Sequence, residues 1–292
     1  MNVTDKAVCL SLSVSSLGNR KKLASDQIEV EADKTMISAT KQLLDAEEFN
    51  DIKKLDSETK AWIAKRALPS FFKAGIYLIP IPLVEPIDKR LESYRIERDE
   101  LVAKFVNAYS RLKEEARTRL NGVFNEADYP PLSAVAKAFS VRSNYVVFDT
   151  PSALKGISEE MWQREKARAE EQWRDASAEI QNAVRVSFAE LVTHMTERLK
   201  PGEDGKPKVF RDTLIGNMGE FLELFEARNI TNDTELAELV NKAKAIMQNV
   251  DPEKLRKDKN LRETVQANME SMKATLDAMI VTKTSRQINL DE

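Results

Sequence analysis

The sequence predicts a mainly α-helical protein in which a long antiparallel, coiled-coil-like helical hairpin connects a small N-terminal β element to a C-terminal helical subdomain. Three observations predict this class. Apolar residues recur at steps of three and four over long segments in the middle of the chain, the period of an amphipathic helix. Runs with strand character occur near the N-terminus. Aromatic residues make up only 7% of the chain and glycines number eight, which leaves little material for an all-β fold.

The first part of the chain, residues 1–85, is predicted to form a small α+β base. From Val8 to Val14 apolar residues alternate with serines and a cysteine, a period of two that is typical of a half-buried strand. The apolar run from Ile76 to Pro82 closes with prolines, which cannot donate to a strand ladder. We expect these two strands to pair in a small sheet. Between them, helical spacing over 51–68 predicts a helix.

Residues 86–200 carry the predicted hairpin. Its first helix runs from Pro86 to Val123, and Arg98 is the only break in the apolar stripe. Its second helix runs from Ser158, whose hydroxyl is suited to an N-cap, to Lys200. Both stripes repeat nearer to eleven residues per three turns than to seven per two, so the helices are expected to run almost straight. This favours an antiparallel pair inside a globular body over a parallel zipper dimer.

The other segments complete the predicted organisation. Residues 124–157 are expected to form the tip of the hairpin, with a short extended element at Tyr145–Phe148. A loop rich in proline and glycine then opens the C-terminal helical subdomain, residues 201–281. Three helices are expected there, over 209–227, 233–249 and 252–280. Residues 282–292 are polar and are expected to form a flexible tail.

Charge and cysteine content limit the possible functions. The chain has 45 basic and 48 acidic side chains and a net charge of −3, which argues against a surface that binds nucleic acid over its whole extent. Cys9 is the single cysteine, so neither an internal disulfide nor a cysteine-rich metal site can form. No stretch reaches the roughly 18 apolar residues of a membrane span, and Met1–Leu17 does not resemble a secretion signal. We therefore expect a cytoplasmic protein without membrane contact.

No catalytic pattern stands out, so the chain is predicted not to be an enzyme and to need no cofactor or metal. His194, the single histidine, lies beside a helix stripe, where a surface position explains it better than a triad or a zinc site. Phosphate-binding glycine motifs are absent. Carboxylate pairs such as Glu170-Glu171 alternate with basic residues, as on a solvated helix face. A magnesium-dependent enzyme, the third hypothesis, would need an acidic cluster assembled from distant helices.

Arg20, Lys21 and Lys22 are the candidate interaction residues. They form the one short basic cluster without compensating acids, and they follow a predicted turn. Such a cluster could contact nucleic acid or an acidic protein surface. A solvated turn is the simpler alternative, since three charges carry little specificity. The segment Lys254–Arg262 is also basic, but acidic residues interrupt it.

Two of the three tryptophans lie on the second long helix. Trp173 belongs to its apolar stripe, and Trp162 stands eleven residues earlier on the same face. Tryptophan can anchor a partner or stack on a base. Neither residue is interleaved with a basic run, so we expect both to belong to the core.

The opening L-S-L-S-V-S-S-L-G-N-R-K-K-L, from Leu10 to Leu23, resembles the start of a bacterial protein family of unknown function whose members occur mainly on phages, plasmids and integrative elements. The resemblance continues through Ile76–Pro82, the Asp88–Leu120 helix and the Phe139–Phe148 segment, roughly the first two thirds of the chain. It implies an accessory protein encoded near AAA+ ATPases of the MoxR or cobaltochelatase type and von Willebrand A-domain proteins. The family has no accepted active-site residues to transfer.

Two hypotheses about function result. The first is a non-enzymatic interaction or assembly protein, an adaptor or structural subunit of a phage or mobile element, which binds a protein partner such as an AAA+ ATPase or self-associates. It depends on long amphipathic helices without convergent catalytic groups. The alternative is a nucleic-acid-binding accessory protein in phage or plasmid DNA metabolism, which would contact the backbone through Arg20, Lys21, Lys22 and the Lys254–Arg262 segment.

Overall fold

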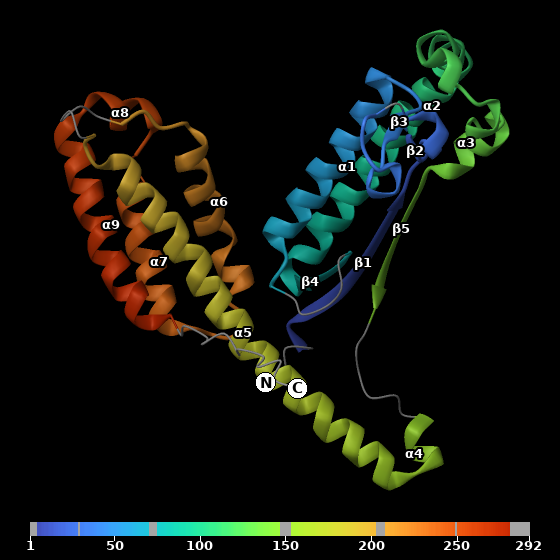
Figure 1. Cartoon of the computed structure of the whole chain (residues 1–292). Coiled ribbons are helices and arrows are strands. Elements are labelled where there is room, and N and C mark those ends of the chain that lie inside the picture. The colour runs from blue at the N-terminus through green and yellow to red at the C-terminus, as the bar shows by residue number, and fades with distance from the viewer. Residues whose placement is uncertain are drawn as a thin grey trace.

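A computed structural model describes residues 5–28, 30–69, 75–146, 153–202, 208–248 and 250–280. Helices dominate these residues, which confirms the mainly α class with a small N-terminal β element and a C-terminal helical region. Figure 1 shows two halves that diverge from one another. The N-terminal half holds a sheet with two long helices beside it. The C-terminal half is a helical bundle that includes part of the longest helix, α5 (Glu159–Leu199).

The main sheet has three antiparallel strands, with β1 (Ala7–Ser15) between β4 (Ile76–Pro80) and β5 (Ser140–Val146). The predicted pairing of the first strand with the proline-flanked strand is confirmed. The extended element predicted at Tyr145–Phe148 corresponds to the end of β5. Its predicted place at the tip of a helical hairpin is wrong, because β5 pairs with β1 in the sheet. Its alternating side chains suit a sheet edge. Residues 147 and 148 of that element lie outside the described part of the chain.

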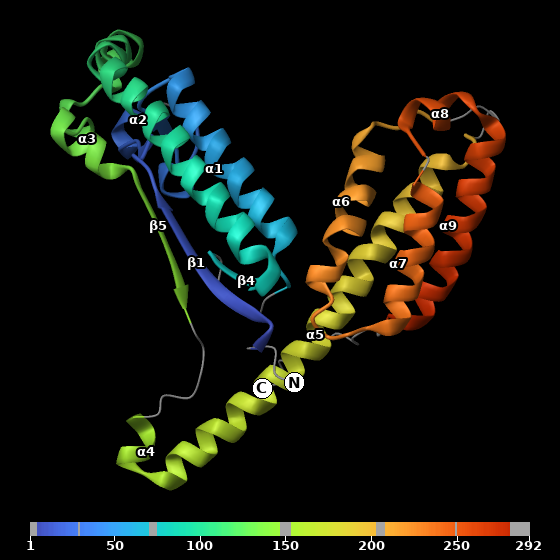
Figure 2. The same cartoon turned by 180° about the vertical axis from the view of Figure 1, so that it is seen from behind.

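One face of the sheet packs against α1 (Glu47–Arg66) and α2 (Val84–Leu120), which lie side by side in Figure 2. Alternation along β1 places Leu10 and Leu12 on this face, where both are buried. The helices contribute further buried side chains, among them Ile63, Ile87, Leu91 and Tyr94. Burial of each such side chain stabilises the fold by about 1.5–3 kcal/mol.

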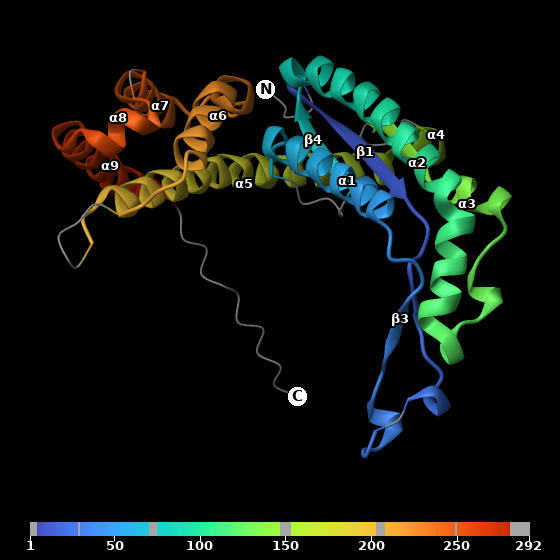
Figure 3. The same cartoon turned by 90° about the horizontal axis from the view of Figure 1, so that it is seen from above.

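A second core lies toward the C-terminal end of α2 and is built from aromatic rings. The ring centroids of Phe49 and Phe139 each lie 5.5 Å from that of Phe105. The helix α3 (Leu132–Ala138) packs against α2 there. A small hairpin of β2 (Arg20–Lys22) and β3 (Thr40–Gln42) extends beyond this core, as Figure 3 shows. Short 3₁₀ turns connect these elements: η2 (Ser25–Gln27), η3 (Lys34–Met36), η4 (Ile81–Leu83), η5 (Asn121–Val123) and η6 (Glu126–Asp128).

The C-terminal half contains α6 (Thr213–Arg228), α7 (Thr234–Met247), α8 (Pro252–Lys257) and α9 (Lys259–Met279). These helices pack around α5, which runs along α9 and also contacts α6. The single helix predicted over 252–280 is in fact two helices. The break occurs at Asp258, whose carboxylate accepts a hydrogen bond from the N–H of Leu261 at 3.0 Å and caps α9.

The predicted hairpin of α2 with α5 is wrong. Both helices form close to the predicted residues, but α2 packs against α1 and the sheet, whereas α5 packs against α9 and α6. An apolar stripe requires an apolar partner without specifying which one. The predicted boundary at residue 200 also divides one core, since Ile180 and Leu199 pack with side chains of the later helices. The predicted tail, 282–292, lies outside the described residues.

Candidate functional site

The N-terminal part of α5 leaves the bundle and, with α4 (Ala153–Ile157), forms a projection that we call the arm, residues 153–175. Figures 1 and 2 show it extending beyond the bundle. Between 159 and 175 no side chain is buried, and Ala176 is the first buried residue of α5. At 1.5 Å per residue this segment spans about 25 Å. Such a solvated segment lacks the tertiary packing of an amphipathic face, from which helices in proteins gain most of their stability.

One face of the arm carries its apolar residues. Trp162, Ala169 and Trp173 recur at helical spacing and are half-buried. Nearby, Ile157 is 74% exposed and Met161 is 37% exposed. Both tryptophans were predicted to belong to the core. This prediction agrees with the structure for Trp173, which packs against the bundle core. It is wrong for Trp162, which belongs to none of the hydrophobic cores formed by the described residues.

Trp162 contacts lysine side chains instead. The Nζ atoms of Lys155 in α4 and Lys166 in α5 lie 5.1 and 5.3 Å from its ring centroid. Such exposed cation–π contacts contribute about 0.5–1 kcal/mol each. They help to hold α4 against α5, but α4 has only five residues and cannot cover the stripe. From Ile157 to Ala169 the arm therefore presents an apolar surface that the described chain leaves uncovered.

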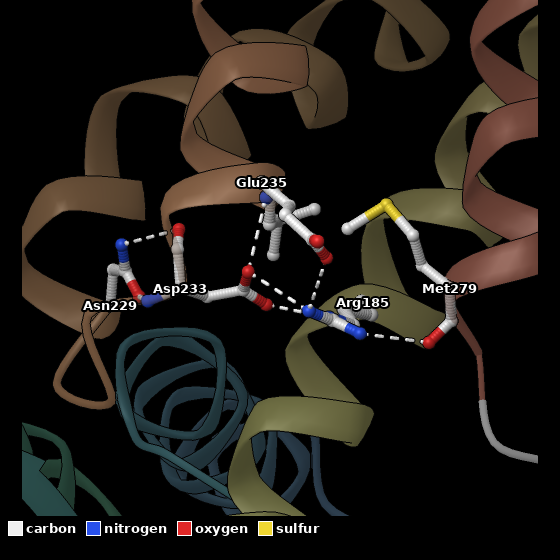
Figure 4. A network of polar contacts seen from close by, with 6 residues as sticks. Arg185, Asn229, Asp233, Glu235 and Met279 are labelled. Atoms are coloured by element: carbon white, nitrogen blue, oxygen red, sulfur yellow. Dashed lines mark hydrogen bonds and ion pairs between the residues drawn. The ribbon is translucent and has the colours of Figure 1, made fainter.

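Arg185 holds α5 in the bundle, beyond the end of the arm (Figure 4). Its Nε donates to Oδ2 of Asp233 at 2.6 Å, and its Nη2 donates to Oδ1 at 3.0 Å. Its Nη1 donates to the carbonyl oxygen of Met279 at 2.9 Å. This bidentate fork is the strongest form of an arginine–carboxylate contact. A single side chain of α5 thereby joins the start of α7 to the end of α9.

Asp233 is also the N-cap of α7, since its Oδ1 accepts a hydrogen bond from the N–H of Leu236 at 3.1 Å. Burial alone would raise the pKa of this carboxyl group. The hydrogen bonds from Arg185 and Leu236 outweigh burial and hold the pKa below its ordinary value. The hydrogen bond to Asp233 likewise raises the pKa of Arg185. Both groups stay ionised at neutral pH, and their contact holds the part of α5 from which the arm continues in the bundle.

The predicted interaction residues Arg20, Lys21 and Lys22 make up β2. All three side chains are exposed, and none forms an ion pair with a described residue. Side chains alternate along a strand, so Lys21 points to the opposite face from the other two. Lys21 lies opposite Lys41 in the hairpin, and Lys41 is buried in an ion pair with Asp128 at 2.8 Å. The structure therefore does not gather the three cations on one surface.

The second basic segment, 254–262, lies on α8 and the start of α9. These helices belong to the C-terminal half, whereas β2 belongs to the N-terminal half (Figure 1). Acidic neighbours accompany its cations: Lys254 pairs with Asp251, Lys257 with Glu253, Lys259 with Glu263 and Arg256 with Asp212. The structure keeps the two basic segments apart, and the second one is largely compensated.

His194 lies on the exposed face of α5, where the Nε of Arg198 is 3.4 Å from its Nε2. It lines a hollow between α1, α5 and α6. Within the described residues, no three His, Cys, Asp or Glu side chains are arranged to hold a metal ion. No helix in the described ranges combines the length and the apolar character that crossing a membrane requires.

Fold and surfaces together define a mainly α protein that projects an amphipathic helical arm from a bundle. No protein-family model matches this chain, and neither a curated protein nor a solved structure matches it. The resemblance to a family of mobile elements therefore stays a prediction from the sequence. The arm is the surface that sequence reasoning missed. Its apolar spacing was visible, but whether another element covers the stripe depends on the packing of the whole chain.

Proposed function

We propose that this chain is a non-enzymatic assembly protein whose arm packs against another protein chain. The observation that carries the proposal is the apolar stripe from Ile157 to Ala169, which the described residues leave uncovered, on a helix that Arg185 holds in the bundle. Helices in proteins gain most of their stability by burying an apolar face. A partner that covers this stripe would supply that burial to the arm.

A second copy of the chain is the partner that the arm accommodates best. Two arms in antiparallel contact about a two-fold axis would place Trp162 of each against the part of Trp173 of the other that its own bundle leaves exposed. Aromatic pairs of this kind contribute about 0.5–1.5 kcal/mol beyond their buried area. The same register sets Gln163 near Glu170, which avoids opposing like charges at that flank.

Size-exclusion chromatography with light scattering tests this proposal on the full chain. We expect a mass that falls toward the 33.1 kDa of a single chain on dilution. Trp162→Glu should give that mass at every concentration, because association would bury an unpaired charge. Ala167→Glu introduces the same side chain at an exposed position off the stripe and should associate like the wild type. Circular dichroism of both variants controls for folding.

A single-chain mass of the wild type at every concentration would contradict the second copy as partner. An AAA+ ATPase of the MoxR or cobaltochelatase type, which the resemblance implies, is then the partner to test with the same two variants. If the wild type bound neither its own copy nor such an ATPase, the proposed docking role of the arm would be rejected.

The exposed cations Arg20, Lys21 and Lys22 support a second candidate, a nucleic-acid-binding accessory protein. Arg20 and Lys22 share one face of β2, and two phosphate contacts would give a slope of log K against log salt of about −1.8 on duplex DNA. Gel shifts at a series of salt concentrations, with the wild type and a variant in which glutamine replaces all three residues, measure this slope. Binding that is absent at low salt, or that survives the triple replacement, rejects this candidate.

A further inference from the structure

A hollow lies at the junction of the two halves, between the end of α1, the C-terminal part of α5 and α6. Its volume of about 680 Å³ falls within the range of small-molecule sites. Such sites form preferentially where two parts of a molecule meet, because neither part fills the space alone. The lining is mixed. Apolar side chains come from Leu191, Phe221 and Leu224, and polar ones include Ser187 and Asn217.

Two ion pairs join the halves beside this hollow. The Nζ of Lys65 lies 2.9 Å from Oε2 of Glu220, and the Nη1 of Arg66 lies 3.1 Å from its Oε1. The hydrogen bond from Lys65, with that from Arg66, holds the pKa of Glu220 below its ordinary value despite partial burial. Each oxygen of this carboxylate is already engaged by a cation. Glu220 is therefore not free to serve as counter-ion for another group.

Arg228, the last residue of α6, lines the same hollow and lacks such compensation. Its Nε is fully covered and has no hydrogen-bond partner, and its guanidinium forms no ion pair with a described residue. Burial lowers its pKa, yet an arginine stays protonated at neutral pH. Its guanidinium carbon lies 5.8 Å from the ring centroid of Phe221. A largely buried cation without a counter-ion destabilises the free protein, and an incoming anion would relieve that cost.

We propose that this hollow binds a small organic carboxylate with an apolar body, and that Arg228 is its anion-binding residue. The carboxylate would accept hydrogen bonds from the guanidinium, while the apolar body would lie against Phe221, Leu224 and Leu191. A singly charged group fits better than a phosphate dianion. Apart from the paired Glu220, the exposed carboxylate of Glu190 also lines the hollow and would oppose a second negative charge.

Isothermal titration calorimetry on the full chain tests this site with 4-phenylbutyrate as the probe. The neutral 4-phenylbutanamide matches its size without the charge. We expect saturable binding of the acid and at least about tenfold weaker binding of the amide, because a hydrogen bond to a charged group accounts for such a difference. Arg228→Met should weaken binding of the acid by a similar factor. Arg90→Met, which removes a cation from an exposed pair on α2, should leave binding unchanged.

Two further measurements keep the test decisive. Arg228→Met should unfold at the same temperature as the wild type or higher, because it removes an uncompensated buried charge. Arg228→Lys keeps the charge but loses the planar fork, so it should bind the acid several-fold more weakly in a folded protein. Phenyl phosphate serves as the dianionic probe. The proposal is overturned if the acid binds no better than the amide, if Arg228→Met or Arg228→Lys binds like the wild type, or if phenyl phosphate binds more tightly than the acid.

Discussion

The guanidinium of Arg98 in α2 donates a hydrogen bond from Nε to Oδ1 of Asp56 in α1 over 2.8 Å, with only 1% of the arginine side chain exposed. Its Nη2 also donates to the carbonyl oxygen of Ser15 at 2.7 Å. The hydroxyl of Tyr94 donates to the same Asp56 oxygen at 2.6 Å, and burial together with that contact raises the pKa of Tyr94. The one interruption in the apolar stripe of α2 is thus the residue that links α2 to α1 and to the sheet.

Replacing Arg98 should therefore destabilise the chain strongly. Arg98→Met leaves the Asp56 carboxylate without its cation, and breaking a buried pair in this way costs about 3–5 kcal/mol. Urea unfolding followed by circular dichroism measures the change in the free energy of unfolding. Arg90→Met removes the exposed partner of Glu97 and should cost less than about 1 kcal/mol. Equal losses in the two variants would show that the Arg98 pair does not hold α1 and α2 together.

Asp233 should make the free energy of unfolding depend on pH in the acid range. Its folded-state pKa lies below the ordinary value of 3.8, so its contribution to stability is present above that value and is lost as the pH falls through the folded-state pKa. Asp233→Asn should be less stable than the wild type by about 1.5–3 kcal/mol at pH 7, because it loses a charged hydrogen-bond partner of Arg185. The difference in the free energy of unfolding between Asp233→Asn and the wild type should disappear as the pH falls below about 4.

Asp251→Asn is the matched control for that titration, because Asp251 caps α8 in the same way but is largely solvated. At pH 7, Asp251→Asn should differ from the wild type by less than Asp233→Asn does, since solvent screens an exposed pair. Thermal unfolding at a series of pH values gives both differences. A difference for Asp233→Asn that stays constant from pH 7 to acid would contradict the assigned role of its ionised carboxylate.

Gly75 should not tolerate a side chain. Its φ of +89° lies in the region that favours glycine, and a Cβ there would come within 3.0 Å of the carbonyl oxygen of Leu12. Its own carbonyl accepts the Leu12 N–H at 2.8 Å, so the backbone cannot move away freely. Gly75→Ala should cost about 1–3 kcal/mol in chemical denaturation. Gly18→Ala, where nothing lies within 4 Å of the added Cβ, should be neutral or slightly stabilising. Similar effects at both glycines would argue against backbone strain at Gly75.

The single thiol should be inert in the folded chain. Cys9 is 3% exposed, and burial raises the pKa of its thiol to about 11. The thiolate is the reactive species, so labelling by a disulfide reagent at pH 8 should be slower than in urea by a factor on the order of 100. Ser13→Cys in a Cys9→Ser background places a thiol at an exposed position of the same strand and should react rapidly without urea. Rapid labelling of Cys9 in the native wild type would show that the end of β1 opens readily.

Hydrophobic periodicity predicted most of the local structure because it reports directly on which side of an element avoids water. The strands β1 and β4 and the cap of α5 at Ser158 all occur close to the predicted residues. The break at Asp258 in the last helix was missed, since the same aspartate can cap a helix or lie on its surface. Trp162 was assigned to a core because its position on the stripe matches that of Trp173. Only the packing of other elements distinguishes the two residues.

By itself, the sequence determined the helical class, the two strands near the N-terminus and the positions of the apolar stripes, since each of these depends on neighbours along the chain. Tertiary structure alone decided that α2 pairs with α1, that α5 pairs with α9, that Trp162 lies outside the cores of the described residues, and that the Nε of Arg228 receives no hydrogen-bond partner among them. The physical reason is that burial of apolar surface is non-directional. A stripe gains similar stability from many partners, so the choice among them depends on the assembled whole.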